Sequence, residues 1–526
     1  MKWLVSIPDS LSLCSLKQRF MLAFVAGALC VLAMPPYGFW PILGLGLPVF
    51  FALLVTTRNV KTAFADAGFF ALGYFGFGLS WVGNALLVDG NPYAWAWPLA
   101  VSGLPAILAM FYGVCGASIK FFTHQNRAAA WCAFVAGLSF TEWLRGHLFT
   151  GFPWNLYGYA WNDHLSIAQS VSLFGSYGLT ALTIMLASLP ALWWLQIGGR
   201  KMRGGVTAVT ISLFIVLFMW GHARLAAHPV EFRSDVALKI VQPNIPQSDK
   251  WNGDKAADNF RKLMDLSQPE TEAAPIPTII IWPETAVVEN AIQHPATLQY
   301  MRDTLQRYPR AAYLSTGILR SDTGPDGNTR YYNSLVTYDR QMNAITVYDK
   351  SHLVPFGEYM PLRQYIPLKA LSGFEGFKAG GGPQTQAVDG LLKISPQICY
   401  EVIFPGASVA RKAGVQALMT PDLIINVTND GWYGDSAGPR QHLAMGRFRA
   451  IEEGIPLARS ANTGISGLFD SYGRLIAYAP LNETKALNVT LPKIADTFYP
   501  IFGDLPFIFF VISILIAIII LNRRSL

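Results

Sequence analysis

The stretch Leu392–Pro405 reads LKISPQICYEVIFP and runs from a strand-like segment into Cys399-Tyr400-Glu401. Cys399 is the only cysteine outside a strongly apolar segment, since the other four lie in the hydrophobic first third of the chain: Cys14, Cys30, Cys115 and Cys132. A cysteine at a strand end, followed by an aromatic residue and a carboxylate, lies where a nucleophile can be presented to substrate. Taken alone, however, a single cysteine is more often a small buried apolar residue.

The composition indicates a membrane protein. Hydrophobic residues make up 52% of the 526 residues and charged residues only 14%, and the mean hydropathy is +0.32. Much of the chain therefore needs a solvent other than water, which several membrane spans explain. The net charge of +7 is not gathered in a basic patch with interleaved aromatics, which argues against a nucleic-acid partner. The five cysteines show no CxxC spacing, so no disulfide framework, metal site or cofactor is expected.

Residues 1–228 are predicted to form a membrane bundle of seven transmembrane helices, and residues 501–526 an eighth helix with a cytoplasmic tail. The expected spans are Phe20–Met34, Pro41–Thr56, Ala63–Val88, Trp95–Ile119, Ala128–Leu144, Ser172–Ile197, Val206–His222 and Phe502–Leu521. Lys and Arg gather in every second connection, so the positive-inside rule places both termini in the cytoplasm. The long segment between the seventh and eighth spans is then expected to face outward.

Residues 229–500 have the pattern of one α/β domain, because short β-rich runs alternate there with helical stretches. The expected strands are Ala237–Ile245, Thr278–Trp282, Tyr313–Ile318, Asn333–Tyr338, Ile345–Lys350, Leu392–Cys399, Leu423–Thr428, Ile465–Asp470 and Leu475–Tyr478. The expected helices are Ala256–Leu266, Ala296–Tyr308 and Pro439–Glu453.

Three of these strand ends carry side chains that can take part in catalysis. Glu284 follows the strand in TIIIWPETA, and Lys350 ends the strand in ITVYDKSHLVPFGE; Cys399 is the third. A thiol nucleophile needs a base and a donor that holds the oxyanion, and open α/β sheets gather such groups at strand carboxyl ends. Each residue also has an ordinary structural reading, as a helix cap, a surface charge or a core cysteine. Their joint occurrence favours a shared site.

The motifs resemble the nitrilase superfamily, whose Glu–Lys–Cys triad occurs in contexts similar to WPE at 282–284, DKSHLVPFGE at 349–358 and ICYE at 398–401. This resemblance implies an αββα sandwich for the outward domain. With membrane spans on both sides, the whole chain resembles the apolipoprotein N-acyltransferase family, enzymes of the bacterial inner membrane that complete lipoprotein maturation. The resemblance therefore implies a membrane α-helical bundle of eight spans plus a periplasmic nitrilase-like catalytic domain.

The resemblance also implies roles for individual residues. Cys399 is expected to be the nucleophile, Glu284 the general base and Lys350 the group that stabilises the tetrahedral intermediate. The supporting residues are expected to be Glu358, Tyr400 and Glu401, and the substrate-binding residues Trp251, Trp154, Asn429 and Trp432. Glycines beside apolar residues in 356–377 predict a mobile lid.

The implied reaction is a ping-pong acyl transfer. The sn-1 acyl chain of a phospholipid, phosphatidylethanolamine by resemblance, passes through a Cys399 thioester to the α-amino group of an apolipoprotein's diacylglyceryl-cysteine. The expected partners are the phospholipid donor, the apolipoprotein acceptor and the membrane, with the enzyme a monomer and no nucleic acid bound. Two alternatives stay open: a membrane-tethered amidase, and a receptor or transporter whose outward domain only binds ligand.

Overall fold

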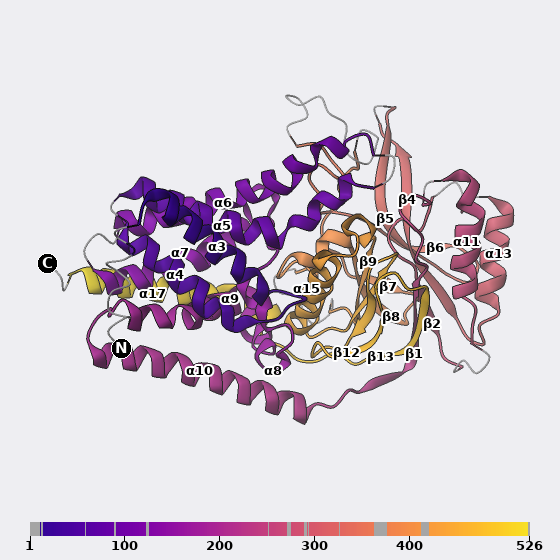
Figure 1. The fold of residues 1–526 in the computed structure, drawn as a ribbon. Coiled ribbons are helices and arrows are strands. Elements are labelled where there is room, and N and C mark those ends of the chain that lie inside the picture. The colour runs from indigo at the N-terminus through magenta and orange to yellow at the C-terminus, as the bar shows by residue number, and fades with distance from the viewer. Residues whose placement is uncertain are drawn as a thin grey trace. The chain divides into compact units, whose positions relative to one another are not determined.

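The computed structural model describes residues 11, 14–57, 59–88, 91–122, 126–250, 252–270, 275–288, 292, 294–325, 327–361, 376–411 and 420–523. Trp251 and most of the expected lid, residues 362–375, lie outside these ranges. The chain forms two compact units (Figure 1). The helical unit contains Met1–Ala227, Ser436–Ala444 and Thr497–Leu526, and the second unit contains His228–Asp435 and Met445–Asp496.

The helical unit is built from apolar helices, some of which begin at a polar capping side chain. Its α-helices are α3 (Leu16–Cys30), α4 (Leu43–Thr56), α5 (Val60–Gly78), α6 (Trp97–Phe122), α7 (Arg127–Arg145), α8 (Leu165–Ala168), α9 (Val171–Trp194), α10 (Arg200–Ala227), α16 (Tyr499–Phe502) and α17 (Leu505–Arg523). Ser15 and Gln18 form a capping box at the start of α3, and the side chains of Asn59 and Asn126 cap α5 and α7. These caps satisfy backbone donors that helix starts leave unpaired.

Five helical segments of the described chain are long and apolar enough to cross a membrane: Leu16–Ala33, Ala94–Phe122, Val171–Trp194, Arg200–Ala227 and Leu505–Arg523. A sixth is reached if α5 and the 3-10 turn η3 (Ser80–Leu86), bent by 52° from each other, form one span. The segment Trp40–Thr56 is apolar but shorter. The structure therefore supports several spans, and the expected count of eight stays a prediction.

Two charged residues near the end of α7 pair with each other inside the helical unit. Arg145 donates to both carboxylate oxygens of Glu142, at 2.8 and 2.6 Å, and neither side chain is exposed. Arg145 also donates to the Phe152 carbonyl at 2.6 Å, and the Tyr112 hydroxyl donates to Glu142 at 2.8 Å. The two charges thus neutralise each other, and Arg145 also fixes the loop after α7 through the Phe152 carbonyl.

The second unit contains two β-sheets. One has the order β13-β1-β2-β4-β5-β6, with β3 also paired to β4, and the other has the order β12-β11-β10-β9-β8-β7. The strands are β1 (Phe232–Gln242), β2 (Thr278–Ile281), β3 (Val287–Val288), β4 (Ala312–Thr323), β5 (Thr329–Tyr338), β6 (Ala344–Asp349), β7 (Gln386–Val388), β8 (Leu392–Ile398), β9 (Leu423–Thr428), β10 (Leu457–Ala461), β11 (Ser466–Phe469), β12 (Leu475–Ala479) and β13 (Lys485–Pro492).

The two sheets share one apolar core, which holds residues of both, such as Leu238 and Ile281 from the first and Ile394 and Val427 from the second. A second core joins the first sheet to helices α11 (Ala256–Leu266) and α13 (Pro295–Gln306), which lie beside each other in Figure 1. Helix α15 (Ala437–Glu453) contacts the second sheet, where the Arg447 guanidinium lies 5.3 Å from the centre of the Phe469 ring on β11. Helices thus accompany both sheets, as an αββα sandwich requires.

Four strands of these sheets were not expected from the sequence: β3, β7, β10 and β13. β10 is buried along its whole length although its central residue is Arg459. The Arg459 guanidinium donates to Asp430 at 2.7 Å, so a residue distant in sequence neutralises the charge that the strand buries. β13 pairs with β1 at the edge of the first sheet and is only partly buried, which weakens its apolar pattern.

Candidate active site

The three residues that sequence reasoning singled out lie together where strands of both sheets end. Lys350 directly follows β6 and Cys399 directly follows β8, while Glu284 lies three residues after β2. All three are buried, with 7% of Glu284, 1% of Lys350 and 8% of Cys399 exposed. The sequence predicted that the three residues meet in a crevice of one open sheet. Two sheets build the site instead, because β2 and β6 belong to one sheet and β8 belongs to the other.

The Lys350 ammonium is held between two carboxylates. Its Nζ donates to Glu358 Oε1 at 2.9 Å and lies 3.6 Å from Glu284 Oε1. Burial alone would lower the pKa of Lys350, but the charges of Glu358 and Glu284 outweigh it and raise the pKa above its usual value. Lys350 therefore carries a positive charge at neutral pH and can stabilise a developing anion.

Asn333, on β5, joins the two carboxylates that flank Lys350. Its amide Nδ2 donates to Glu284 Oε1 at 2.7 Å and to Glu358 Oε1 at 3.0 Å. The backbone N–H of Asn429 donates to the other oxygen of Glu284 at 2.9 Å. Sequence reasoning missed Asn333; the only signal was an amide at the start of an apolar run, and such a residue needs polar partners when buried.

Cys399 adopts a left-handed backbone conformation, with φ of +52°. Few residues other than glycine adopt this conformation, and it is concentrated at functional turns. Burial raises the pKa of the Cys399 thiol to about 12; the Glu284 carboxylate adds to this, and the Lys350 charge opposes it. The thiol is therefore protonated at neutral pH, and a base must remove its proton before it can act as a nucleophile.

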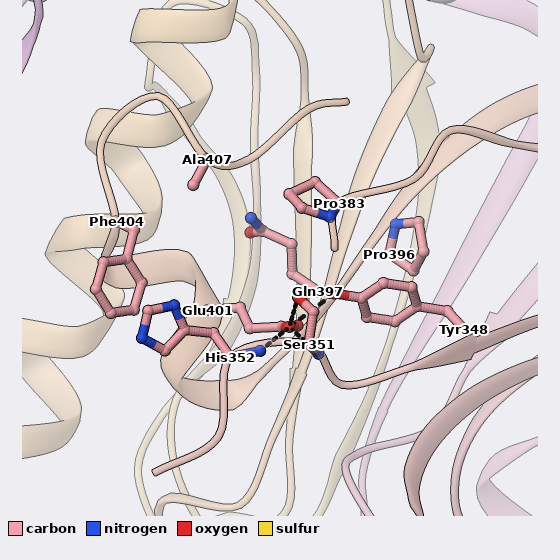
Figure 2. Close-up of a pocket in the computed structure, with 9 residues that line it drawn as sticks. All are labelled: Tyr348, Ser351, His352, Pro383, Pro396, Gln397, Glu401, Phe404 and Ala407. Carbon is pink, nitrogen blue, oxygen red and sulfur yellow. Dashed lines mark hydrogen bonds between the residues drawn. The ribbon is translucent and has the colours of Figure 1, made fainter. Parts of the chain in front are cut away.

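Glu401 ties the strand end before Cys399 to the turn after Lys350. Figure 2 shows its hydrogen bonds to residues of and around that turn. Its Oε2 accepts from Ile398 N–H at 2.8 Å. Its Oε1 accepts from the Tyr348 hydroxyl at 2.7 Å, from Ser351 N–H and Oγ at 2.7 and 2.8 Å, and from His352 N–H at 3.1 Å. A buried carboxylate with this many donors holds both segments in fixed register.

A cavity of about 70 Å³ lies beside Glu401 and is lined by Gln397, His352 and Phe404 among others (Figure 2). Pockets that take drug-sized ligands measure about 300–1,000 Å³, so this cavity is too small for a lipid chain. Gln397 is 2% exposed, and its amide N and O have no hydrogen-bond partner within the described ranges. Ordered water is the usual partner for such groups in a cavity of this size.

Replacing Glu401 with glutamine is expected to lower both stability and activity. The new NH₂ group would face backbone and hydroxyl donors that now point at a carboxylate oxygen. Leaving such donors unpaired costs about 3 kcal/mol or more, which corresponds to a melting temperature lower by about 6 °C or more. Thermal unfolding in detergent measures this, and Glu483→Gln on the exposed surface is the matched control. An unchanged melting temperature would contradict the structural role of Glu401.

The remaining expected site residues lie in different settings. Tyr400 packs edge-on against Phe404, with ring centres 5.1 Å apart. Asn429 is buried, and its side-chain amide donates to Gln247 at 2.7 Å. Its backbone N–H donates to the Glu284 carboxylate and so supports that residue. Trp432 is half-buried in the turn η9 (Asp430–Tyr433), and substrate contact there stays a prediction.

Trp154 belongs to the helical unit and is 1% exposed. Its indole N–H donates to Gln441 Oε1 at 2.8 Å, and its ring lies 4.7 Å from that of Trp81. Gln441 also accepts from the Trp81 indole at 3.1 Å. The described contacts of Trp154 are thus packing and hydrogen bonds within its own unit, and its expected role in substrate binding stays a prediction.

Each of the two parts of the chain matches a known protein family. Residues 26–189 match the apolipoprotein N-acyltransferase N-terminal domain family, and residues 239–495 match the carbon-nitrogen hydrolase family. Among solved structures, a CN-hydrolase superfamily protein from Xanthomonas campestris is similar to this chain, with 20% identity and a TM-score of 0.35. It covers 49% of this chain and 91% of its own.

Whole-length relatives are more similar. An apolipoprotein N-acyltransferase from Rhodopseudomonas palustris is 35% identical over 527 residues, which is 96% of each chain. One from Brucella melitensis is 38% identical over 503 residues, which is 92% of this chain and 91% of its own. Identity at this level over nearly the whole length, with both domain families matched in order, shows that the chain belongs to the apolipoprotein N-acyltransferase family.

Proposed function

We propose that this N-acyltransferase transfers a fatty acyl chain from a phospholipid to the N-terminal α-amino group of an apolipoprotein, through a thioester on Cys399. The observation that carries the proposal is the buried cluster of Glu284, Lys350 and Cys399, with Glu358 bonded to Lys350. Base, cation and thiol are the set that acyl transfer through a thioester requires.

In the first step, Glu284 takes the proton of the Cys399 thiol, and the thiolate attacks the sn-1 ester carbonyl of the phospholipid. The negative charge that develops on the carbonyl oxygen is stabilised by Lys350 and a backbone N–H near the nucleophile. When the ester C–O bond breaks, the lysophospholipid oxygen takes the proton back from Glu284. A thioester on Cys399 remains, and Glu284 is again a carboxylate.

In the second step, the neutral α-amino group of a diacylglyceryl-cysteine attacks the thioester carbonyl. Glu284 accepts the amine proton and returns it to the sulfur as the C–S bond breaks, which regenerates the Cys399 thiol. The product is an amide. Because an amide is more stable than a thioester, this step runs downhill.

Both substrates carry acyl chains, which fits a chain with several membrane-crossing helices. Charge in the connecting segments supports an orientation with both termini in the cytoplasm and the second unit in the periplasm of a bacterial inner membrane. The resemblance to the family supports phosphatidylethanolamine as donor and a monomeric enzyme. Protease added to intact spheroplasts tests the orientation, since only a periplasmic second unit would be cut.

The proposal is tested by incubating the enzyme with phospholipid labelled in the sn-1 chain and analysing the peptide that contains residue 399 by mass. The wild type is expected to gain one acyl group on Cys399, which an added diacylglyceryl peptide removes as an amide. Cys399→Ser is expected to gain no hydroxylamine-labile label. Discharge by water at the same rate with and without the peptide would instead identify a tethered hydrolase.

The raised thiol pKa predicts how Cys399 reacts with iodoacetamide, a neutral alkylating reagent. Since only the thiolate reacts and its pKa is about 12, the alkylation rate is expected to rise about tenfold per pH unit from pH 7 to pH 10, without a plateau. Mass analysis of the residue-399 peptide over time measures the rate. A plateau reached below pH 9 would show that the resting thiol is already ionised and that the assigned protonation state is wrong.

A further inference from the structure

A second lysine contacts the turn that carries Glu284. Lys250 lies in the segment that follows β1, and its Nζ donates to the Glu284 carbonyl at 2.9 Å and to the Thr285 hydroxyl at 2.7 Å. Its side chain is half-buried. Lys250 therefore binds the backbone of the catalytic glutamate, while Lys350 and Asn333 contact the carboxylate of the same residue.

The turn after Glu284 needs such support. Thr285 has a φ of +44°, a conformation that β-branched residues rarely adopt. The turn is also pressed against β4: a Cβ added to Gly317 would lie 2.6 Å from Glu284 Cα and 2.4 Å from the Pro283 carbonyl oxygen. A strained turn persists only where its surroundings hold it, and Lys250 bonds both residues at its centre.

The charges around Lys250 connect it to the reacting groups. Burial lowers the pKa of Lys250 to about 8, and the negative charges of Glu284 and of an ionised Cys399 oppose this fall. The neighbouring carboxylate of Asp249 is occupied by Lys255, 2.9 Å away. Lys350, which lies near the Glu284 carboxylate, is bonded to Glu358. Besides Lys350, Lys250 is thus a second positive charge that interacts with Cys399.

We propose that Lys250 is a positioning residue for acyl transfer: its ammonium holds the backbone turn that aims Glu284 at Cys399 and favours the negative charge that forms there when the thiol ionises. This inference rests on the proposed roles of Glu284 and Cys399. It assigns to Lys250 an action through these two residues and no contact with substrate.

The test is single-turnover thioester formation from labelled phospholipid, measured per folded full-length enzyme between pH 6 and pH 10. Lys250→Met is expected to slow thioester formation about 10-fold to 100-fold at pH 7, since small displacements of a catalytic group have effects of this size. Lys250→Arg keeps the charge and the donors, and is expected to recover most of the rate. Lys255→Met, a neighbouring exposed lysine, is the control and is expected to react as the wild type does.

The pH dependence separates this role from a general loss of structure. The ratio of the wild-type rate to the Lys250→Met rate is expected to fall as the pH rises through about 8, where the wild-type lysine loses its charge. The ratio of Lys250→Arg to Lys250→Met is expected to stay constant, because arginine remains charged. A Lys250→Met enzyme with the wild-type rate, or a wild-type ratio independent of pH, would overturn the inference. Label retained by Cys399→Ser would instead overturn the proposed function.

Discussion

Replacing Lys350 with methionine is expected to abolish acyl transfer and to destabilise the second unit. Lys350 is 1% exposed and lies 2.9 Å from Glu358 and 3.6 Å from Glu284. Its loss would leave two buried carboxylates, joined by Asn333, without a neutralising charge. Breaking a buried ion pair on one side costs about 3–5 kcal/mol, and losing one oxyanion donor slows catalysis about 100-fold or more.

Two measurements check this expectation: thermal unfolding in detergent and the rate of acyl transfer to a diacylglyceryl peptide. Lys378→Met is the matched control, because Lys378 is exposed and its described hydrogen bond is made by its backbone N–H. The control should keep both the melting temperature and the rate. A Lys350→Met enzyme with more than one tenth of the wild-type rate would show that Lys350 does not hold the oxyanion.

Replacing Glu284 with glutamine is expected to reduce thioester formation by about 10³-fold or more, since general base catalysis contributes about 10²–10⁴. The shape of the side chain is kept, but the amide cannot accept the thiol proton. Both carboxylate oxygens now accept hydrogen bonds, from Asn333 at 2.7 Å and from Asn429 at 2.9 Å. In either orientation of the new amide, its NH₂ group would face one of these donors.

The loss of the base can be distinguished from the loss of the site by alkylation. Glu284 raises the pKa of the Cys399 thiol, so Glu284→Gln is expected to make Cys399 react faster with iodoacetamide at a given pH while acyl transfer falls. Because unfolding would also expose this buried thiol, both rates are measured at a temperature at which thermal unfolding in detergent shows the variant to be folded, and opposite changes there identify the loss of the base. A parallel fall of both rates would contradict the assigned role of Glu284.

Some helices and strands have the bounds that the sequence predicted, because their patterns are local. β9 occupies Leu423–Thr428 as expected, and α11 occupies Ala256–Leu266, since each is a short segment whose own pattern specifies its state. The strand ends that precede Glu284, Lys350 and Cys399 were visible for the same reason. Hydropathy alone also identified the five segments that are apolar enough to cross a membrane.

Tertiary contacts decided what these local patterns left open. Asn333 and Lys250 contact Glu284 from positions 49 and 34 residues away in the chain. Glu401 holds Ser351 across 50 residues. A hydrogen bond of this kind depends on which strand ends meet when two sheets pack, and a residue's neighbours in sequence do not carry that information.

The sequence by itself therefore identified Glu284, Lys350 and Cys399 as candidate groups of one site, and indicated the kind of solvent that each part of the chain needs. Only the tertiary structure decided how those groups are held. The Glu284 backbone carbonyl accepts from the Lys250 side chain and its carboxylate accepts from two donors, Lys350 lies between two carboxylates, and Cys399 lies in a left-handed turn beside the Glu401 hydrogen bonds. The physical reason is that burial makes each polar group depend on a partner, and packing alone brings distant partners within hydrogen-bond reach.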